Sequence, residues 1–335
     1  MVTLKDVAKV AGVSASTVSL VINKKRFVEQ DTKLRVLKAI KDLDYHPNML
    51  AKYLQTGKSY IIGLVVSDIT NPFFPEIVRG VELRSVNKGY DTFLCNTDYN
   101  PKRTTAVVNR LIEKKVDGAI IMTLERDRNL LEKLTVNKIP VVLFNWERTG
   151  QLVSNIKEDF DTGLKEAISH LAGLGHRSIA FISGPLRFTT AQNRKNAFLS
   201  ILKDYPARIK APFIIEENFK VDGGESAAEK ILSLSEPPTA IIASNDLMAI
   251  GTIRKLKEKG YSIPDDFSVV GFNDIMLSSF VDPPLTTINV PRYRMGQIAW
   301  NLLYKLISDR DKMGSEQTVD AMLVVRGTTG KVKKS

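Results

Sequence analysis

The chain has 335 residues, of which 43% are hydrophobic and 25% are charged, and its formal net charge is +11. This balance excludes a wholly disordered chain, and the length indicates two or three domains. No apolar run approaches the roughly 20 residues that a membrane-spanning helix needs. The charged start lacks the apolar core of a signal peptide, so we expect a cytoplasmic protein with no membrane partner. One cysteine and three histidines offer few metal ligands, and we expect no metal, no cofactor and no catalytic residue.

The positive charge is concentrated in the N-terminal part of the chain. Residues 1–60 hold 11 Lys and Arg against 5 Asp and Glu, so they carry +6 of the net charge of +11. A small basic unit ahead of a nearly balanced body indicates a polyanionic partner such as a nucleic acid. A solvated charged surface would give the same counts, so charge alone leaves both interpretations open.

A first short helix is predicted over residues 4–11. Thr3 is placed to cap its N-terminus, with Asp6 at the position from which a carboxylate returns to the cap. Gly12 then ends the helix. The residues of its apolar face recur at helical spacing: Leu4, Val7, Ala8 and Ala11.

Two more helices are predicted to follow, which together indicate a helix-turn-helix. Ser14 caps the second helix, over residues 17–22, and the third runs from about 31 to 43. The apolar residues of the third helix are Leu34, Leu37, Ala39, Ile40 and Leu43. An ordinary small helical bundle is the alternative, but it would require neither this glycine turn nor this basic charge.

The residue types and spacing of 3–14, 16–19 and 21–23 resemble the DNA-binding head of the lac-repressor (LacI/GalR) family. In that family the second helix enters the major groove of double-stranded DNA. The resemblance implies that three residues read bases, namely Ala15, Ser16 and Leu20. It implies that three others contact phosphates, which fix register without reading sequence, namely Thr17, Ser19 and Asn23.

Leu20 departs from the family pattern, because many members carry a long polar residue at this position. A leucine cannot form a hydrogen bond with a base edge, but it can pack on a thymine methyl group. We therefore expect Leu20 to read an apolar surface and Ser16 to supply most of the polar readout. The alternative is that Leu20 belongs to the core of the head.

Residues 48–54 are predicted to form one short helix after Pro47, too short to be stable alone. The segment resembles the hinge helix of the same family, which a homodimer inserts as a pair into the minor groove. The resemblance assigns the wedge between base pairs to Leu54 and close helix approach to Ala51. Lys52 keeps the positive charge that other members supply with arginine.

From Tyr60 onward, short β-rich runs alternate with helical patterns, which indicates an α/β fold with parallel sheets in two similar halves. The expected strands cover residues 61–66, 92–95, 118–122, 141–144, 179–183, 213–215, 240–243, 268–272 and 321–325. The expected helices include about 74–87, 106–115, 164–174, 194–202, 225–234, 246–259 and 292–308.

The predicted organisation has three parts. They are an all-α helix-turn-helix DNA-binding domain (1–46), a hinge helix and linker (47–59), and a ligand-binding and dimerisation domain (60–335). Within the last we expect an N-subdomain of about 60–158 plus 289–319 and a C-subdomain of about 159–288 plus 320–330, each a doubly wound parallel sheet.

Several motifs of the body resemble the periplasmic-binding-protein-like effector domain of the same family, among them Asp68 to Phe74, Ser244 to Gly251 and Gly271 to Asp274. Ligands of open parallel sheets bind beyond the carboxyl ends of the strands, so we expect the site in the cleft between the halves. The resemblance implies eight effector-binding residues: Asn71, Phe73, Phe74, Trp146, Arg194, Phe219, Asn245 and Asn273.

Four residues in or near this set have a purely structural alternative. Phe74 is as readily a core residue, Asn245 a helix cap and Arg194 a surface charge. His176, after the helix stop at Gly175, is more readily structural than functional.

The residues of this expected site suit a sugar or sugar derivative, since aromatic faces pack on C–H surfaces while amides and arginine bind hydroxyls. Asn273 stands where sugar-binding members carry aspartate, and Phe188 where purine-binding members carry arginine, which argues against a purine. With Arg194 and Arg187 nearby, our hypothesis is an anionic ligand such as a sugar acid or sugar phosphate.

The sequence therefore predicts a DNA-binding transcriptional regulator, specifically a repressor that binds a palindromic operator as a homodimer under the control of a small-molecule effector. A dimer is expected because the leucine heptads that tetramerise some members are absent. The alternatives are a solute-binding protein of sugar transport and an α/β enzyme. The helix-turn-helix argues against the first, and the lack of a nucleophile–base pair argues against the second.

Replacing Leu20 with Arg should change which operator sequences the protein prefers, because arginine binds guanine where leucine packs on thymine. Selection of binding sites from random DNA by the wild-type and L20R proteins measures this change. An identical preference in the two selections would place Leu20 outside the DNA interface.

Overall fold

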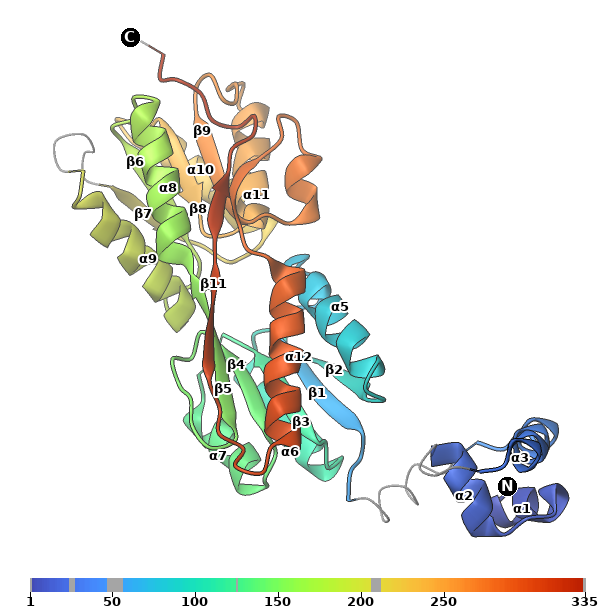
Figure 1. Ribbon diagram of the computed structural model, residues 1–335. Helices are drawn as coiled ribbons and strands as arrows, with labels where there is room; N and C mark the ends of the chain where they lie inside the picture. Colours follow the sequence, from blue (N-terminus) through green and yellow to red (C-terminus); the bar gives the residue numbers. More distant parts are fainter. Residues whose placement is uncertain (1, 24–27, 47–56, 125, 206–211, 334–335) are drawn as a thin grey trace. The chain divides into compact units, whose positions relative to one another are not determined.

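The computed structural model describes residues 2–23, 28–46, 57–124, 126–205 and 212–333. They form two compact units, Met1–Ser59 and Tyr60–Ser335, which we call the head and the body (Figure 1). The predicted hinge helix, with Ala51, Lys52 and Leu54, lies outside the described residues, and so does the side chain of Asn23. Their assigned roles stay predictions.

The head consists of the helices α1 (Leu4–Ala11), α2 (Ala15–Asn23) and α3 (Gln30–Asp42). Both predicted ends of α1 are confirmed. The backbone N–H of Thr3 donates to Asp6 (2.8 Å), while the N–H of Asp6 donates to the Thr3 hydroxyl (3.4 Å). Gly12 takes the left-handed conformation, with φ of +64°, which glycine adopts without steric cost.

The core of the head is small, and residue type alone does not define it. α3 turns Val36 and Ala39 into this core, whereas the larger Leu34 and Leu37 are 57% and 45% exposed. The helical period decides which side chains are buried, and here it favours the smaller pair.

The body contains two six-stranded sheets, and we call the parts built on them the N-lobe and the C-lobe. The N-lobe sheet has the order β11-β5-β4-β3-β1-β2, and all its pairs are parallel. Its strands are β1 (Ile61–Val66), β2 (Asp91–Asn96), β3 (Gly118–Met122), β4 (Val141–Phe144), β5 (Val153–Asp159) and β11 (Glu316–Asp320).

The C-lobe sheet has the order β12-β10-β9-β8-β6-β7, and only the pair of β12 with β10 is antiparallel. Its strands are β6 (Ile179–Ser183), β7 (Phe213–Glu216), β8 (Ala240–Ala243), β9 (Ser268–Asn273), β10 (Thr286–Asn289) and β12 (Met322–Val324). The expected fold class, a helix-turn-helix followed by two doubly wound halves, is confirmed.

Helices cover both faces of each sheet. In the N-lobe they are α5 (Phe73–Val86), α6 (Pro101–Glu113), α7 (Arg128–Val136) and α12 (Arg292–Ser308). In the C-lobe they are α8 (Phe160–Gly173), α9 (Thr189–Leu202), α10 (Val221–Leu232) and α11 (Asp246–Glu258), with a 3₁₀ turn, η1, at Met276–Ser279.

The alternation along β1 shows how the two helical layers are filled. Ile62, Leu64 and Val66 belong to the core cluster that contains residues of α5 and α12, whereas Val65 belongs to the cluster that contains residues of α6 and α7. Both faces are buried, so the strand is apolar throughout, as expected for a covered parallel sheet.

The chain passes between the lobes three times, at the joins between β5 and α8, between β10 and α12, and between β11 and β12 (Figure 1). Three strands were absent from the sequence prediction, namely β5, β10 and β11. The strand β11 is polar and mostly exposed at a sheet edge, so it lacks the apolar run by which buried strands are recognised.

The contact between α5 and α12 depends on two glycines. A Cβ atom on Gly296 would lie 2.2 Å from the carbonyl oxygen of Ile77, and one on Gly80 would lie 2.3 Å from that of Tyr293. Only residues without a side chain allow the two backbones to approach this closely.

Replacing Gly296 with Ala should therefore separate α5 from α12 and lower the free energy of unfolding by about 1–3 kcal/mol, which denaturant titration measures. Gly173→Ala is the matched control, because no atom lies within 4 Å of a Cβ at this helix end. Equal stabilities of the two variants would contradict the close-approach argument.

Candidate functional site

A cavity of about 710 Å³, open solvent at its mouth included, lies between the lobes at the carboxyl ends of both sheets, where ligands of open parallel sheets bind. Its N-lobe lining follows β1 to β5 and consists of Asn71, Phe73, Phe74, Tyr99, Met122, Thr123, Leu124, Phe144, Asn145 and Glu158. Its C-lobe lining consists of Thr190, Ala191, Arg194, Phe219, Asn245 and Asn273.

Seven of the eight residues predicted for effector binding line this cavity, and Trp146 does not. Asn145, with φ of +58°, turns the backbone so that Asn145 itself lines the cavity. The side chain of Trp146 packs against the N-lobe cluster around β3, β4 and α6, and its backbone N–H donates to Asn155 (3.1 Å). This geometry does not support the predicted role of Trp146.

A buried ion pair joins the lobes at the cavity. Arg194 on α9 of the C-lobe donates to Glu158 on β5 of the N-lobe (3.1 Å), and both side chains are almost fully buried. A second Nη–H donates to the Ser244 carbonyl (2.7 Å), and the guanidinium lies 4.0 Å from the Phe272 ring centre. Arg194 is thus no surface charge. Burial lowers its pKa, and the neighbouring Glu158 opposes that effect.

Two asparagines from the C-lobe line the cavity with different degrees of hydrogen bonding. Asn245 caps α11 through Met248 N–H (2.8 Å) and donates to the Phe219 carbonyl (2.8 Å), so the predicted cap role is confirmed. Asn273 is buried, and among the described residues its Oδ1 has no hydrogen-bond partner. An unpaired buried acceptor is costly, so a ligand that donates to it gains affinity.

Aromatic rings form one part of the site. Tyr99 of the N-lobe stacks on Phe219 of the C-lobe, with 6.3 Å between ring centres, and Phe188 lies within 6.5 Å of both. Phe73 meets Phe74 edge to face at 5.3 Å, and the buried Phe74 belongs to the core as well as to the lining. These faces suit the C–H surface of a sugar or a planar ring.

The charge of the lining bears on the ligand. The negative charge of Glu158 balances the positive charge of Arg194, its ion-pair partner, while Arg187 lies over the Phe188 ring rather than in the lining. The two cations on which the hypothesis of an anionic ligand depended are therefore not free in the cavity.

Two lining residues that bear on the ligand, Glu158 and Tyr99, were missed by the sequence prediction. Glu158 is the last residue but one of a strand that was itself unpredicted, and its partner lies on the other lobe. Tyr99 follows β2 in a left-handed conformation, with φ of +51°. Their positions in the sequence could have indicated them, because both residues come at or just after the carboxyl end of a parallel strand.

On the head, α2 presents the residues assigned to DNA. The Ser14 hydroxyl accepts from Thr17 N–H (3.1 Å), as predicted for a cap, and lies 2.7 Å from the Ser16 hydroxyl. Ser16 is exposed and Ser19 is half-buried. Leu20 is half-buried but is not among the residues that pack on the head core, whereas Ala15 is.

His176 is structural, as expected. Its ring nitrogens lie 2.9 Å from the hydroxyls of Thr239 and Ser268, and burial lowers its pKa. Across the described ranges, no cluster of three His, Cys, Asp or Glu side chains could hold a metal ion. None of the helices described here combines the length and the apolar character needed to cross a membrane.

Comparisons with known proteins agree with both parts of the architecture. Residues 3–48 match the lacI family of bacterial regulatory proteins, and residues 168–329 match a periplasmic binding protein-like domain. The chain is 39% identical to the HTH-type transcriptional repressor PurR of Histophilus somni over 327 residues, which cover 97% of this chain and 98% of that protein.

Solved structures give the same picture. The lac repressor dimer bound to its operator and an anti-inducer aligns over 98% of this chain and 99% of that chain, with a TM-score of 0.86 and 29% identity. A LacI family regulator from Enterococcus faecium with bound ribose aligns over 82% of this chain and 100% of that chain, with a TM-score of 0.74 and 30% identity.

A helix-turn-helix head followed by a two-lobed body with a cavity defines a DNA-binding transcriptional regulator. The chain belongs to the lacI family of bacterial regulatory proteins.

Replacing Glu158 with Gln should destabilise the body by about 3–5 kcal/mol, because it leaves the buried Arg194 charge uncompensated. Denaturant titration measures the change. Glu258→Gln is the control, since its pair with Lys255 (3.1 Å) is exposed on the Glu258 side and its loss should change stability little. A similar small effect at both positions would show that the buried pair does not hold the lobes together.

Proposed function

We propose that the protein is a repressor that binds a two-fold symmetric operator as a homodimer. Its affinity for the operator would rise or fall when a neutral sugar or sugar derivative binds in the cavity. The observation that carries this proposal is the cavity itself. Seven predicted residues from two lobes converge on it at the carboxyl ends of both sheets.

The DNA contacts are proposed for α2. The helix begins at the Ser14 cap with Ser16 exposed and with Leu20 outside the core set. The N-terminal residues of such a recognition helix reach base edges in the major groove. Ala15, Ser16 and Leu20 would read bases, while Thr17, Ser19 and Asn23 would contact phosphates, and Ala51, Lys52 and Leu54 would act in the minor groove.

The class of effector follows from the lining. A hydroxyl group both donates and accepts, so it can donate to the unpaired Oδ1 of Asn273 while its C–H neighbours pack on the aromatic rings. The balanced charge of Arg194 and Glu158 favours a neutral ligand over an acid or a phosphate. Bound ribose in the Enterococcus faecium relative is consistent with this class.

Control of DNA binding would follow from the arrangement of the lobes. The effector touches both lobes, so it favours the lobe arrangement that it binds more tightly. A change in that arrangement within a dimer would alter the spacing of the two hinge segments, and with it the position of Leu54.

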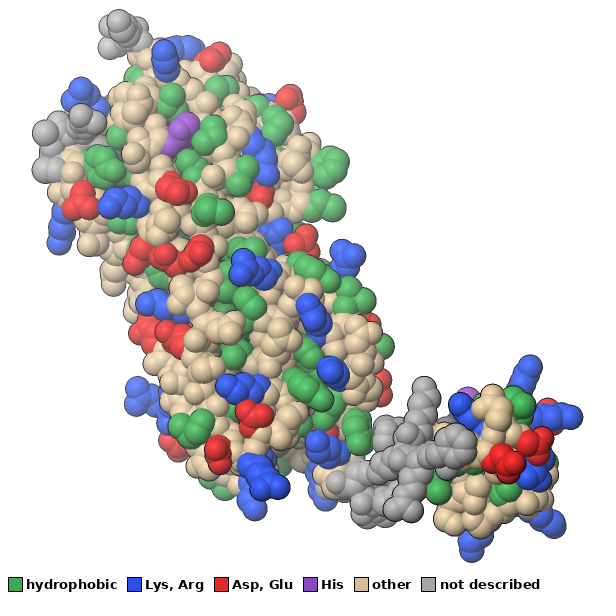
Figure 2. Space-filling model, viewed as in Figure 1, with side chains coloured by type: hydrophobic (Ala, Val, Ile, Leu, Met, Phe, Trp, Pro, Cys, Tyr) green, Lys and Arg blue, Asp and Glu red, His purple; other side chains and the backbone are tan. Residues whose placement is uncertain are grey.

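The homodimer is proposed to form along the edge of the body that carries α5. Exposed apolar side chains on α5, β2 and the η1 segment are Leu83, Val86, Leu94, Met276, Leu277 and Phe280. Figure 2 shows hydrophobic side chains along this edge over both lobes. Apolar groups this large are rarely left in water on a monomer, and Phe280 is 76% exposed.

The proposed function is tested by selecting operators from random DNA and measuring fluorescence anisotropy on the selected palindrome, on its half-site and on random DNA. We expect the palindrome to bind at least about 10³-fold more tightly than random DNA at equal salt. Binding should weaken steeply with salt. No preference for a two-fold site, with or without sugars, would refute the proposal.

The effector class is tested by melting the protein with D-ribose, D-glucose and cellobiose, with D-gluconate and ribose 5-phosphate, and with adenine and hypoxanthine. A bound ligand raises the melting temperature. We expect a rise with a neutral sugar, and a rise only with an anionic sugar or a purine base would contradict the proposed class.

The variant L83E/F280E should be monomeric in sedimentation velocity and should bind the palindrome at least about tenfold more weakly, because charged side chains would enter an apolar interface. Val136→Glu is the control, since Val136 is 79% exposed on α7, which packs on the other face of the N-lobe sheet from α5. A dimeric L83E/F280E variant would move the interface elsewhere.

A further inference from the structure

The backbone that presents Asn273 to the cavity is strained. Asn273 has φ of +105° and Asp274 has φ of +53°, so two successive residues with side chains occupy the left-handed region. Such a conformation persists only where the surroundings hold it. Arg292 donates to the Asn273 carbonyl and pairs with Glu76 of α5 at 3.3 Å.

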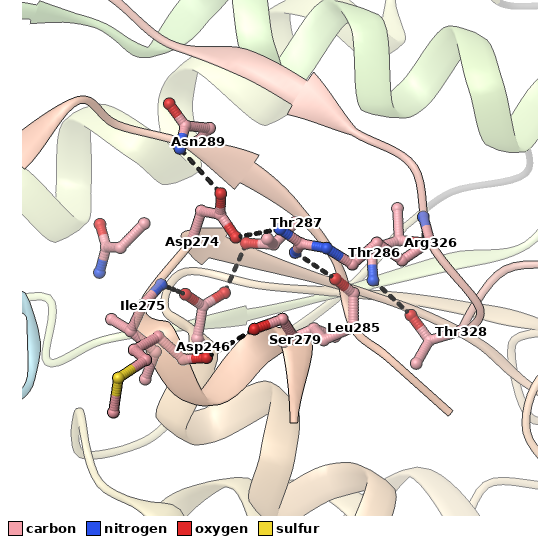
Figure 3. Close-up of polar contacts among 12 residues, drawn as sticks. Asp246, Asp274, Ile275, Ser279, Leu285, Thr286, Thr287, Asn289, Arg326 and Thr328 are labelled. Carbon is pink, nitrogen blue, oxygen red and sulfur yellow. Dashed lines mark hydrogen bonds and ion pairs between the residues drawn. The ribbon is translucent and has the colours of Figure 1, made fainter. Parts of the chain in front are cut away.

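A fully buried carboxylate holds the other side of this turn (Figure 3). One oxygen of Asp246 accepts from the backbone N–H of Ile275 (2.8 Å), and the other accepts from the Thr287 hydroxyl (2.5 Å). The place beside it is kept free by Gly271, whose added Cβ would lie 2.3 Å from the carboxylate.

The neighbouring Asp274 is held by different partners in the same view. Asp274 pairs with Arg326 (2.7 Å) and accepts from the Asn289 side chain (2.8 Å) (Figure 3). Arg326 in turn donates to the Leu285 carbonyl (2.8 Å). The turn is therefore fixed from α11, from β10 and from the C-terminal end of the chain.

Asp246 connects the two asparagines of the cavity. It is the first residue of α11, next to the cap Asn245, and it binds the amide two residues after Asn273. We propose that Asp246 is a positioning residue, which fixes the turn that presents Asn273 and so determines how tightly the cavity holds its effector without touching it. The part of this proposal that concerns the effector rests on the proposed function.

The protonation of Asp246 provides a readout that a passive structural residue would lack. Burial and the nearby charge of Asp274 raise its pKa to about 7, and Arg194 is the positive group that faces it from α9. Protonation converts one acceptor oxygen of Asp246 into a donor, so it weakens the hydrogen bonds by which the carboxylate holds the turn. Effector affinity should therefore fall as the pH decreases from 8 to 6.

The test compares the wild-type chain with D246N and T287V, which weaken the contact from either side with little change in volume. D266N is the matched control. Asp266 also accepts from a backbone N–H, that of Ser262 (2.7 Å), and pairs with Lys333 (2.7 Å), but these partners lie outside the turn that follows Asn273.

Hydrogen exchange followed by mass spectrometry reports the turn without any ligand. We expect residues 273–279 to exchange about tenfold faster in D246N and T287V than in the wild-type and D266N chains, because the Ile275 amide loses protection. Unchanged exchange in both D246N and T287V would overturn the proposal.

Calorimetric titration with the neutral sugar that gives the largest rise in melting temperature reports the cavity. We expect binding about tenfold weaker in D246N at pH 8, and pH dependence between 6 and 8 in the wild-type but not in D246N. Equal affinities would overturn the link to the effector. If no sugar of the panel binds the wild-type chain, the proposed effector class fails, and hydrogen exchange alone decides the role of Asp246.

Discussion

The buried ion pair between Arg194 and Glu158 is the interaction on which the body depends. It joins a helix of one lobe to a strand of the other at the wall of the cavity, and the burial of both side chains reduces the screening of their charges by water. The arrangement has two consequences. The lobes are bound to each other at the point where a ligand enters, and the ligand meets a lining whose charge is already balanced. One contact therefore bears on both the closure of the cleft and the choice of ligand.

The remaining polar groups of the cavity divide into satisfied and unsatisfied ones. Asn245 has partners for both its amide oxygen and its amide nitrogen, so its side chain stabilises the fold. Asn273 has an unpaired oxygen on a strained turn, so it is available to a ligand. The position of each side chain is set by contacts behind the cavity wall, which is why the carboxylate of Asp246 bears on recognition from outside the lining.

The sequence predicts the fold well where apolar patterns are strong. The strand Ile61–Val66 and the helix Arg292–Ser308 have the predicted bounds, because a continuous apolar run and a long helical period are unambiguous. β5 and β11 escaped prediction because polar residues dominate their sequences. Leu34 and Leu37 show that residue type alone does not predict burial, since the helical period exposes them while burying Val36.

The site was predictable to the extent that motifs mark strand ends. Asn71, Arg194 and Asn273 meet at the cavity because each lies at or after the carboxyl end of a parallel strand, Asn71 in a loop, Arg194 in a helix and Asn273 at the strand end itself. Glu158 could not be assigned to Arg194, since their contact exists only when the lobes pack. Trp146 was assigned to the cavity by its motif position, but Asn145, in a left-handed conformation, lines the cavity in its place, and the role of Trp146 stays a prediction.

The threefold passage of the chain between the lobes constrains how such proteins can be recombined. The last strand of each sheet, β11 in the N-lobe and β12 in the C-lobe, is added after the chain has passed through the other lobe. A single-junction chimera with a relative, cut anywhere among these strands, would leave at least one sheet of mixed parentage. Exchanging the whole C-lobe, and with it one wall of the cavity, requires three junctions made together.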